Sequence, residues 1–313
     1  MSVIERARVS IRDTRPMEPR KGGHRATTSL SLTFDVPGRE LRCPMVTATI
    51  AGCTTQLIVD TGATSHLLTT DLVRRAGLHL TAAAPGRDVA GDPVPSWTVG
   101  DVLVEVEDSS VMIRDVVAID GPEPFREWGV GGFLSPQTVS DDATVLLDLV
   151  LNRIDILGDE SATVLADLVR RFDDYVLLEG ARHAAGTIGI RTRVPPAPPV
   201  VAIFDTGAAE TQIARAALDT EVNGTMSAGG KGVGGSGFEV TILKNQHLEV
   251  GATAIRVPEL AVRDEIPAPD DAADGELPLA LIGMDVLHST ALAIAPTGVG
   301  SVWWFVPHDE ARS

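Results

Sequence analysis

Residues 57–68 read LIVDTGATSHLL, and residues 202–213 read AIFDTGAAETQI. In both stretches an apolar run typical of a buried strand ends directly at Asp-Thr-Gly-Ala. One Asp-Thr-Gly is weak evidence, because aspartate and glycine are common turn residues. The two aspartates, Asp60 and Asp205, are 205 − 60 = 145 residues apart. That separation is too long for a solenoid repeat and predicts a duplicated lobe.

The sequence after each copy repeats the same order of features. A glycine-containing turn and alternating β segments follow both copies. Each half then closes on an apolar segment that contains glycine, WGVGGFLSP at 128–136 or LALIGMDVLHS at 279–289. We therefore expect two similar halves built mainly of short strands. VWWFV at 302–306 is expected to be a buried late strand rather than a binding pocket.

Two helices are predicted among the strands. TTDLVRRAGL at 69–78 offers Thr69 or Thr70 as the N-cap and Gly77 as the stop signal. SATVLADLVRRF at 161–172 begins at the capping residue Ser161. Its apolar residues form one helical stripe, namely Val164, Leu165, Leu168, Val169 and Phe172.

These patterns divide the chain into four segments. We expect a flexible N-terminal segment over 1–26, an N-terminal lobe over 27–158, a helical connector over 159–180 and a C-terminal lobe over 181–313. The proline-rich PPAPP within the last segment is predicted to be an exposed hairpin or connector.

The composition excludes several classes of protein. With a formal net charge of −17, the chain would repel phosphate backbones and anionic membranes, so we expect no nucleic-acid or membrane partner. No apolar run approaches the length of a membrane span, and the first twenty residues lack a signal-peptide core, so we expect a soluble cytoplasmic protein. Cys43 and Cys53 fit no zinc pattern and are expected to be reduced thiols.

The repeated motif resembles that of the retropepsin-like aspartic peptidases. Asp-Thr-Gly-Ala is the usual form in that group, the run at 60–78 matches its motif with the following helix, and LIGMDVL at 281–287 is similar to the segment that closes each lobe. The resemblance covers roughly 41–294. It implies an all-β fold with two similar retropepsin-like or pepsin-like β-barrel lobes, few short helices and an active cleft between the lobes.

The resemblance also implies a reaction. Asp60 and Asp205 would be the catalytic pair of an aspartic endopeptidase, in which two adjacent carboxyl groups share one proton and activate a water molecule; aspartic proteases are the standard example of such a pair. No metal and no other cofactor is expected. The substrate would be a peptide or protein, and a monomer should be active because both halves belong to one chain.

Further residues receive roles from the same resemblance. Six support the active loops: Thr61, Gly62, Ala63, Thr206, Gly207 and Ala208. Gly283 and Gly131 are expected to support these loops from the closing segments. Gly91, Gly234 and Gly235 are the candidate flap or substrate-binding residues. The only tyrosine is Tyr175, so the flap tyrosine of pepsin-like enzymes is absent.

Two other interpretations of the sequence remain open. One is a noncatalytic peptide-binding or scaffold protein on the same fold. The other is a β-sandwich binding module with accidental Asp-Thr-Gly turns, in which Asp60 and Asp205 would not meet. A dinucleotide-binding loop is excluded, because GVGGSG at 232–237 leads into an alternating strand rather than a helix.

Overall fold

The computed structural model of the protein describes residues 28–36, 39–87, 92–157, 161–183, 186–219, 225–231, 237–266, 277–308 and 311–312. Strands dominate these residues and the helices are few and short. The predicted all-β fold class is therefore confirmed.

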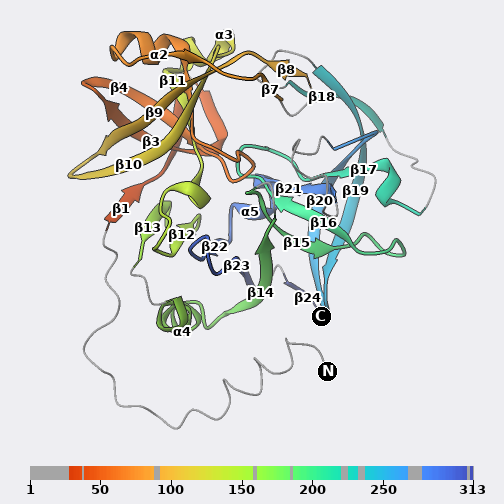
Figure 1. The fold of residues 1–313 in the computed structure, drawn as a ribbon. Helices are drawn as coiled ribbons and strands as arrows, with labels where there is room; N and C mark the ends of the chain where they lie inside the picture. Colours follow the sequence, from red (N-terminus) through yellow and green to blue (C-terminus); the bar gives the residue numbers. More distant parts are fainter. Residues whose placement is uncertain are drawn as a thin grey trace.

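Six strands of the first half form a closed barrel (Figure 1). In order around the barrel they are β3 (Arg39–Ile50), β4 (Cys53–Val59), β11 (Val130–Leu134), β5 (Leu67–Thr69), β10 (Ser109–Ile119) and β9 (Ser96–Val106). The pairing of Thr49 with Glu105 brings β3 and β9 together and closes the ring. Four short strands flank it: β2 (Thr33–Val36), β6 (Thr81–Ala82), β7 (Gly86–Arg87) and β8 (Pro93–Val94).

The second half repeats this strand order. The equivalent strands are β15 (Ile188–Thr192), β16 (Val200–Phe204), β21 (Pro278–Ile282), β17 (Gln212–Ala214), β20 (Thr253–Arg263) and β19 (Gly237–Val250). Arg193 and Glu249 bridge its two ends. Both lie 144 residues after the closing pair of the first half, since 193 − 49 and 249 − 105 both equal 144. β18 (Thr225–Lys231) and β24 (Ala311–Arg312) pair with this unit.

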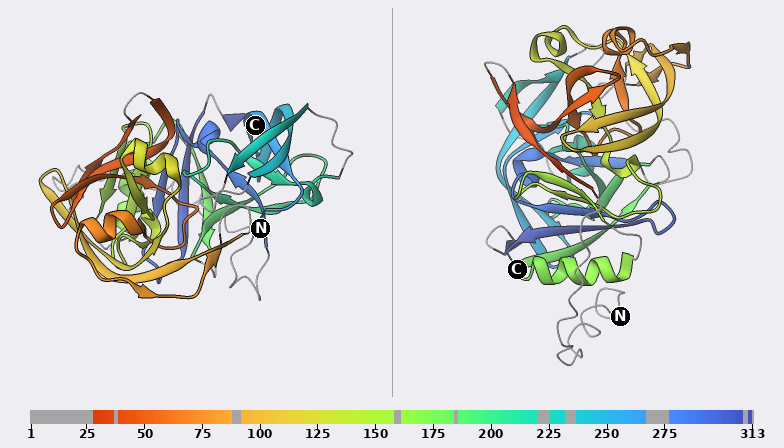
Figure 2. Two further views of the ribbon diagram at one scale, coloured as in Figure 1. Left: turned by 90° about the horizontal axis from the view of Figure 1, so that it is seen from above. Right: turned by 90° about the vertical axis from the view of Figure 1, so that its left-hand side faces the viewer.

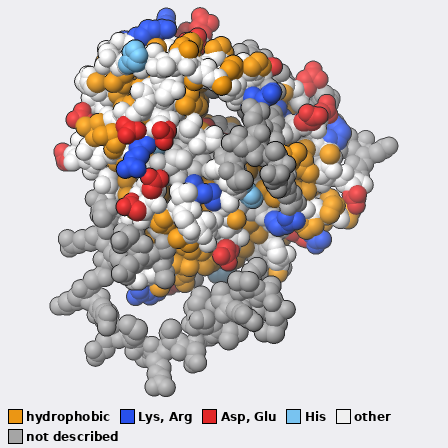
Figure 3. Space-filling model, in the orientation of Figure 1, with side chains coloured by type: hydrophobic (Ala, Val, Ile, Leu, Met, Phe, Trp, Pro, Cys, Tyr) orange, Lys and Arg blue, Asp and Glu red, His pale blue; other side chains and the backbone are white. Residues whose placement is uncertain are grey.

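A third group of strands joins the halves. In spatial order they are β1 (Thr28–Ser31), β13 (Arg153–Ile156), β12 (Val145–Asp148), β22 (Ala291–Ile294), β23 (Ser301–Pro307) and β14 (Tyr175–Arg182). β12 from the first half pairs antiparallel with β22 from the second. The two barrels lie side by side above this joining sheet, as the views in Figure 2 show. In the space-filling view the surface is hollowed beside the N-terminal barrel, at the upper centre (Figure 3).

Both predicted helices are present. In α2 (Thr70–Arg75) the N-cap is Thr69, whose hydroxyl accepts from the backbone N–H of Leu72, and Gly77 takes a left-handed conformation with φ +66° just after the helix. In α4 (Ser161–Arg171) the predicted apolar stripe packs on the joining sheet, beside Trp303 and Phe305. Together with the buried Trp304, these aromatic residues confirm the prediction of a late-strand core.

Four further helical turns were not predicted. They are α3 (Glu123–Trp128), α5 (Met284–Leu287) and the 3₁₀ turns η1 (Pro136–Thr138) and η2 (Arg215–Ala217). All are six residues or shorter, too short for a helical period to show in the sequence. Among the described residues, no helix is long and apolar enough to cross a membrane.

Candidate active site

Asp60 and Asp205 occupy equivalent places in the two barrels. Each follows the last residue of a central strand, β4 or β16, that is paired in parallel with β11 or β21. The N–H of Asp60 donates to the carbonyl of Leu134, and the N–H of Asp205 donates to the carbonyl of Ile282, both over 2.9 Å. These strand ends fix where each aspartate leaves its sheet.

The two loops meet between the barrels. A Cβ atom placed on Gly62 would lie 2.7 Å from Cγ of Asp205, and one on Gly207 would lie 2.8 Å from Cγ of Asp60. Gly62 also donates its N–H to Asp60, and Gly207 donates to Asp205, so each glycine lies against both aspartates. Each loop therefore uses a glycine because any larger residue would strike the aspartate of the opposite loop.

Backbone donors of each loop converge on its own aspartate. Oδ1 of Asp60 accepts from the N–H groups of Gly62 at 2.8 Å and Ala63 at 3.2 Å. In the other loop, Oδ1 of Asp205 accepts from Gly207 at 2.9 Å and Ala208 at 3.0 Å. One oxygen of each carboxyl group is thus fixed by its loop.

Thr61 and Thr206 lock the loops together. Each hydroxyl accepts from the backbone N–H of the other threonine, at 3.0 and 3.1 Å. Each hydroxyl also donates across the interface, Thr61 to the carbonyl of Phe204 at 2.7 Å and Thr206 to the carbonyl of Val59 at 2.6 Å. Both threonines are fully buried, so four satisfied hydrogen bonds hold the pair of aspartates in register.

The electrostatics of the pair favour the protonated form. Burial raises the pKa of both carboxyl groups, and the charge of Asp60 adds to the rise at Asp205, whose pKa reaches about 8. The N–H groups of Gly62 and Ala63 oppose the rise at Asp60. Both shifts favour retention of a proton by these two carboxyl groups.

Residues behind the first loop were missed by sequence reasoning. The hydroxyl of Ser135 donates to the carbonyl of Ala63 at 2.9 Å, and its N–H donates to Nδ1 of His66 at 3.2 Å. Burial lowers the pKa of His66 to about 4, so the ring is neutral and its proton lies on Nε2, facing Thr138. His66 is thus a structural support rather than an acid or base.

The prediction for Gly131 is wrong, whereas Gly283 lies against its loop as expected. Ile282 pairs with Phe204 and Leu134 pairs with Val59, so the residue equivalent to Gly283 is Ser135. A Cβ atom on Gly283 would meet the backbone of Glu210 at 2.5 Å. Gly131 instead packs against the side chain of Thr55, because β11 shifts register before its last residues.

Cys43 is a further residue beside the pair. Its thiol donates to the carbonyl of Gly207 at 3.2 Å, from strand β3 of the other barrel. Burial and the charges of Asp60 and Asp205 raise the pKa of this thiol to about 12. It is therefore a neutral hydrogen-bond donor and not a nucleophile.

The three candidate flap residues, Gly91, Gly234 and Gly235, lie outside the described residues. Their roles stay predictions. Within the described part of the chain, no group of three or more His, Cys, Asp or Glu side chains could hold a metal ion.

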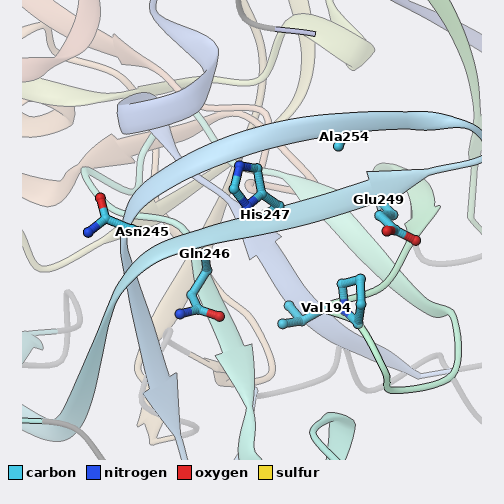
Figure 4. Close-up of a pocket in the computed structure, with 7 residues that line it drawn as sticks. Val194, Asn245, Gln246, His247, Glu249 and Ala254 are labelled. Carbon is cyan, nitrogen blue, oxygen red and sulfur yellow. The ribbon is translucent and has the colours of Figure 1, made fainter. Parts of the chain in front are cut away.

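A separate surface pocket lies on the C-terminal barrel, between β19 and the connection from β15 to β16 (Figure 4). Its lining residues are Val194, Pro195, Asn245, Gln246, His247, Glu249 and Ala254. None of them belongs to the two Asp-Thr-Gly-Ala loops. Glu249 forms an ion pair with Arg193 at 2.6 Å, so the charge of this lining residue is already balanced.

Part of the N-terminal half is similar to a known protein family. Residues 46–129, which span most of the N-terminal barrel and contain Asp60, match the family model described as "Aspartyl protease". Over these residues the chain is therefore similar to the aspartyl protease family. A comparison with curated proteins gave no match.

Solved structures with similar folds include both an enzyme and seed globulins. Aspartic proteinase from Irpex lacteus is 13% identical, with a TM-score of 0.47 over 90% of this chain and 97% of that one. Conglutin gamma from lupine seeds is 11% identical, with a TM-score of 0.47 over 88% and 94% of the two chains. Basic 7S globulin from soybean is 9% identical, with a TM-score of 0.48 over 88% and 94%.

Proposed function

We propose that this protein is an aspartic endopeptidase that hydrolyses peptide bonds with a water molecule activated by Asp60 and Asp205. The observation that carries the proposal is the close approach of each carboxyl group to the glycine of the opposite loop, one carboxyl group from each barrel. Two carboxyl groups so close cannot both ionise, and the raised pKa values agree with a shared proton.

The proposed reaction uses the two carboxyl groups and one water molecule. The ionised carboxylate takes a proton from the water, whose oxygen attacks the peptide carbonyl carbon. The protonated carboxyl group donates to the carbonyl oxygen, which becomes the second hydroxyl of a tetrahedral diol. As the diol collapses, one of its hydroxyl groups returns a proton to the pair and re-forms the carbonyl, the C–N bond breaks, and the nitrogen gains a proton from the pair, which again holds one proton. The proposed chemistry uses no cofactor.

The family match and the intact loops favour an enzyme over a noncatalytic relative. A scaffold that only binds peptides has no need for two adjacent, repelling carboxyl groups. Here both aspartates are present, each receives two backbone N–H donors, and both remain partly exposed. Since both loops belong to one chain, the proposed active species is the monomer, and its substrate is a peptide or protein.

The direct test is digestion of a mixed peptide library by the purified full chain. We expect cleavage within peptides that is insensitive to EDTA and to reagents that modify serine or cysteine, because the proposed chemistry uses neither a metal nor a covalent intermediate. Mass spectrometry of the products reads out the cleaved bonds. Complete inactivation by EDTA would assign the activity to a metallopeptidase instead.

The pH dependence of the rate is a second expected result. The active form holds one proton, so kcat/KM should follow a bell, rising as the first proton leaves and falling as the second leaves near the raised pKa of about 8 at Asp205. A rate that keeps rising beyond pH 9, in folded protein, would contradict a shared proton.

Folding must be followed in the same experiment. Because the pKa of Asp205 is raised, the folded chain keeps a proton that an unfolded carboxyl group loses near ~4. The contribution of this pair to stability is therefore full at low pH and is lost as the pH rises towards 8. Circular dichroism at each pH separates loss of the fold from loss of the active ionisation state.

A further inference from the structure

The two loops are equivalent in backbone but are supported by different side chains. Leu134 and Ile282 occupy the same place, since each accepts from the N–H of its aspartate. Three residues further along, the first barrel has Gln137 and the second has Asp285. Both side chains lie behind the loops, so this is a chemical difference between the surroundings of Asp60 and Asp205.

Gln137 fastens two carbonyl groups of the first loop. Its Nε2 donates to the carbonyl of Thr61 at 3.0 Å and to the carbonyl of Ala63 at 2.7 Å. The side chain is 1% exposed, and among the described residues its Oε1 has no partner. The two carbonyl oxygens can only accept hydrogen bonds, so the amide nitrogen must face them and this orientation is fixed by chemistry.

The carbonyl of Thr61 belongs to the same peptide group as the N–H of Gly62. The hydrogen bond from that N–H is the shorter of the two that Asp60 accepts from the backbone. Gln137 therefore holds one end of the peptide group whose other end donates to the carboxylate. A hydrogen bond accepted by the carbonyl also polarises the peptide and strengthens its N–H as a donor.

The second loop has no equivalent amide. Asp285 accepts from the hydroxyl of Thr211 at 2.7 Å, and Thr211 in turn accepts from the N–H of Gly283 at 3.1 Å. A carboxylate cannot donate to loop carbonyl groups. Instead, the carbonyl of Ala208 accepts from the backbone N–H of Met284 at 2.9 Å.

Among the described residues, a cationic side chain contacts the backbone of Gln137, whereas none contacts Asp285. The guanidinium group of Arg182, at the end of β14, donates to the backbone carbonyl of Gln137 at 3.0 Å and to that of Ala295 at 3.4 Å. It thereby ties the turn that carries Gln137 to the joining sheet. Glu210 lies close to Asp285 and adds negative charge on the side of Asp205.

We propose that Gln137 is a positioning residue that makes Asp60 the ionised member of the pair and leaves the shared proton on Asp205. This inference rests on the proposed function and refines it: Asp60 takes the proton from water, and Asp205 donates to the peptide carbonyl. Burial raises the pKa of both carboxyl groups, and backbone hydrogen bonds oppose the rise at both. The charge of Asp60 raises the pKa of Asp205 further, which agrees with a proton on Asp205.

Other titratable groups around Asp60 do not reverse this order. Cys43 faces the pair from β3 and is neutral, and His66 is neutral in the adjoining turn. Arg182 contributes a positive charge on the side of Gln137. Asp285 and Glu210 lie on the side of Asp205 and favour protonation there.

The test replaces Gln137 by methionine, which keeps the length of the side chain but removes its N–H groups, and by glutamate, which replaces donors with acceptors. Gln56→Met, at a half-exposed glutamine on β4, is the matched control. We expect Gln137→Met to lower kcat roughly tenfold to a hundredfold with little change in KM. The acidic limb of the rate profile should move to higher pH, because the N–H of Gly62 becomes a weaker and less well positioned donor to Asp60. The glutamate variant should show a larger shift.

A second measurement needs no catalysis. Carboxyl ¹³C signals of labelled aspartate, assigned with Asp60→Asn and Asp205→Asn, report which group ionises first in the wild-type chain. We expect Asp60 to do so, and in Gln137→Met its step should move to higher pH. If no peptide is cleaved by wild type, the proposed function fails while this titration still decides the order of ionisation.

Two results would overturn the inference. One is a wild-type titration in which Asp205 ionises first, which stands even if the Gln137 variants do not fold. The other is a folded Gln137→Met variant with a lower melting temperature but an unmoved acidic limb and an unmoved first step, because Gln137 would then only stabilise the fold.

Discussion

Asp60→Asn and Asp205→Asn are each expected to reduce kcat for peptide hydrolysis by about four orders of magnitude or more, with the fold intact. Asparagine has the same shape as aspartate but can neither share the proton nor take one from water. Residues that act as one catalytic unit fail together, so the double variant should be little worse than either single variant. Single-turnover kinetics on a peptide found in the library digest provide the measurement.

The matched control is Asp108→Asn, at an exposed turn between β9 and β10. It removes the same charge from the chain without touching the pair, so its rate should equal that of the wild type. We also expect the asparagine variants at Asp60 and Asp205 to be at least as stable as wild type near neutral pH, because each removes one of two adjacent carboxyl groups that oppose each other's ionisation. Near-wild-type turnover by either variant would contradict the proposed catalytic role of the two aspartates and favour a peptide-binding scaffold.

The fold could be predicted because its decisive features are local and repeated. Apolar alternation identifies strands, and the Asp-Thr-Gly-Ala copies fix the start of two equivalent halves. The cap of α2 was also visible, because Thr69 and Gly77 carry the chemistry of a helix start and stop. One hydrogen bond decides which of Thr69 and Thr70 is the N-cap, because the backbone N–H of Leu72 donates to the hydroxyl of Thr69.

The supports of the site could not be predicted, because they depend on strand register. In the first half, the sequence points to Gly131 as the support, and only the pairing of Leu134 with Val59 shows that Ser135 takes this place. Gly132 is needed for another reason, since a Cβ atom there would lie 2.0 Å from the carbonyl oxygen of Leu67. Aligning FLS at 133–135 with LIG at 281–283 would have found the correct register.

Gln137 and Cys43 carried no sequence signal of their own. The amide of Gln137 acts through backbone carbonyl groups that are more than seventy residues away in the chain. The thiol of Cys43 reaches a carbonyl of the other barrel. A single sequence does not encode such contacts in any short motif, so they follow only from the arrangement of the strands.

Gly62→Ala and Gly207→Ala are the second pair of substitutions for which we expect a large effect. Neither glycine has a positive φ, so alanine would cause no backbone strain, and the whole effect arises from the added methyl group. At Gly62 that methyl carbon would lie 2.7 to 2.9 Å from the carboxyl atoms of Asp205, and at Gly207 it would lie 2.8 to 2.9 Å from those of Asp60. Carbon atoms in contact prefer separations of about 3.5 to 4.0 Å.

Each alanine must therefore push the opposite aspartate away from its partner or push the two loops apart. A misplacement of about 1 Å at reacting groups can cost a hundredfold in rate, so we expect kcat/KM to fall at least that far in both variants. Gly298→Ala is the control, because a Cβ atom there meets no other atom within 4 Å and the residue has no positive φ. Its activity should match that of wild type.

The two alanine variants also test the pairing of the loops apart from the chemistry. Separated carboxyl groups repel each other less, so the alkaline limb of the rate profile should move to lower pH in each variant that keeps measurable activity. A loss of stability alone would lower the melting temperature and leave that limb in place. If Gly62→Ala retained both full activity and an unchanged alkaline limb, the carboxyl group of Asp205 could not lie against the first loop, and the contact between the two aspartates would not exist in the working protein.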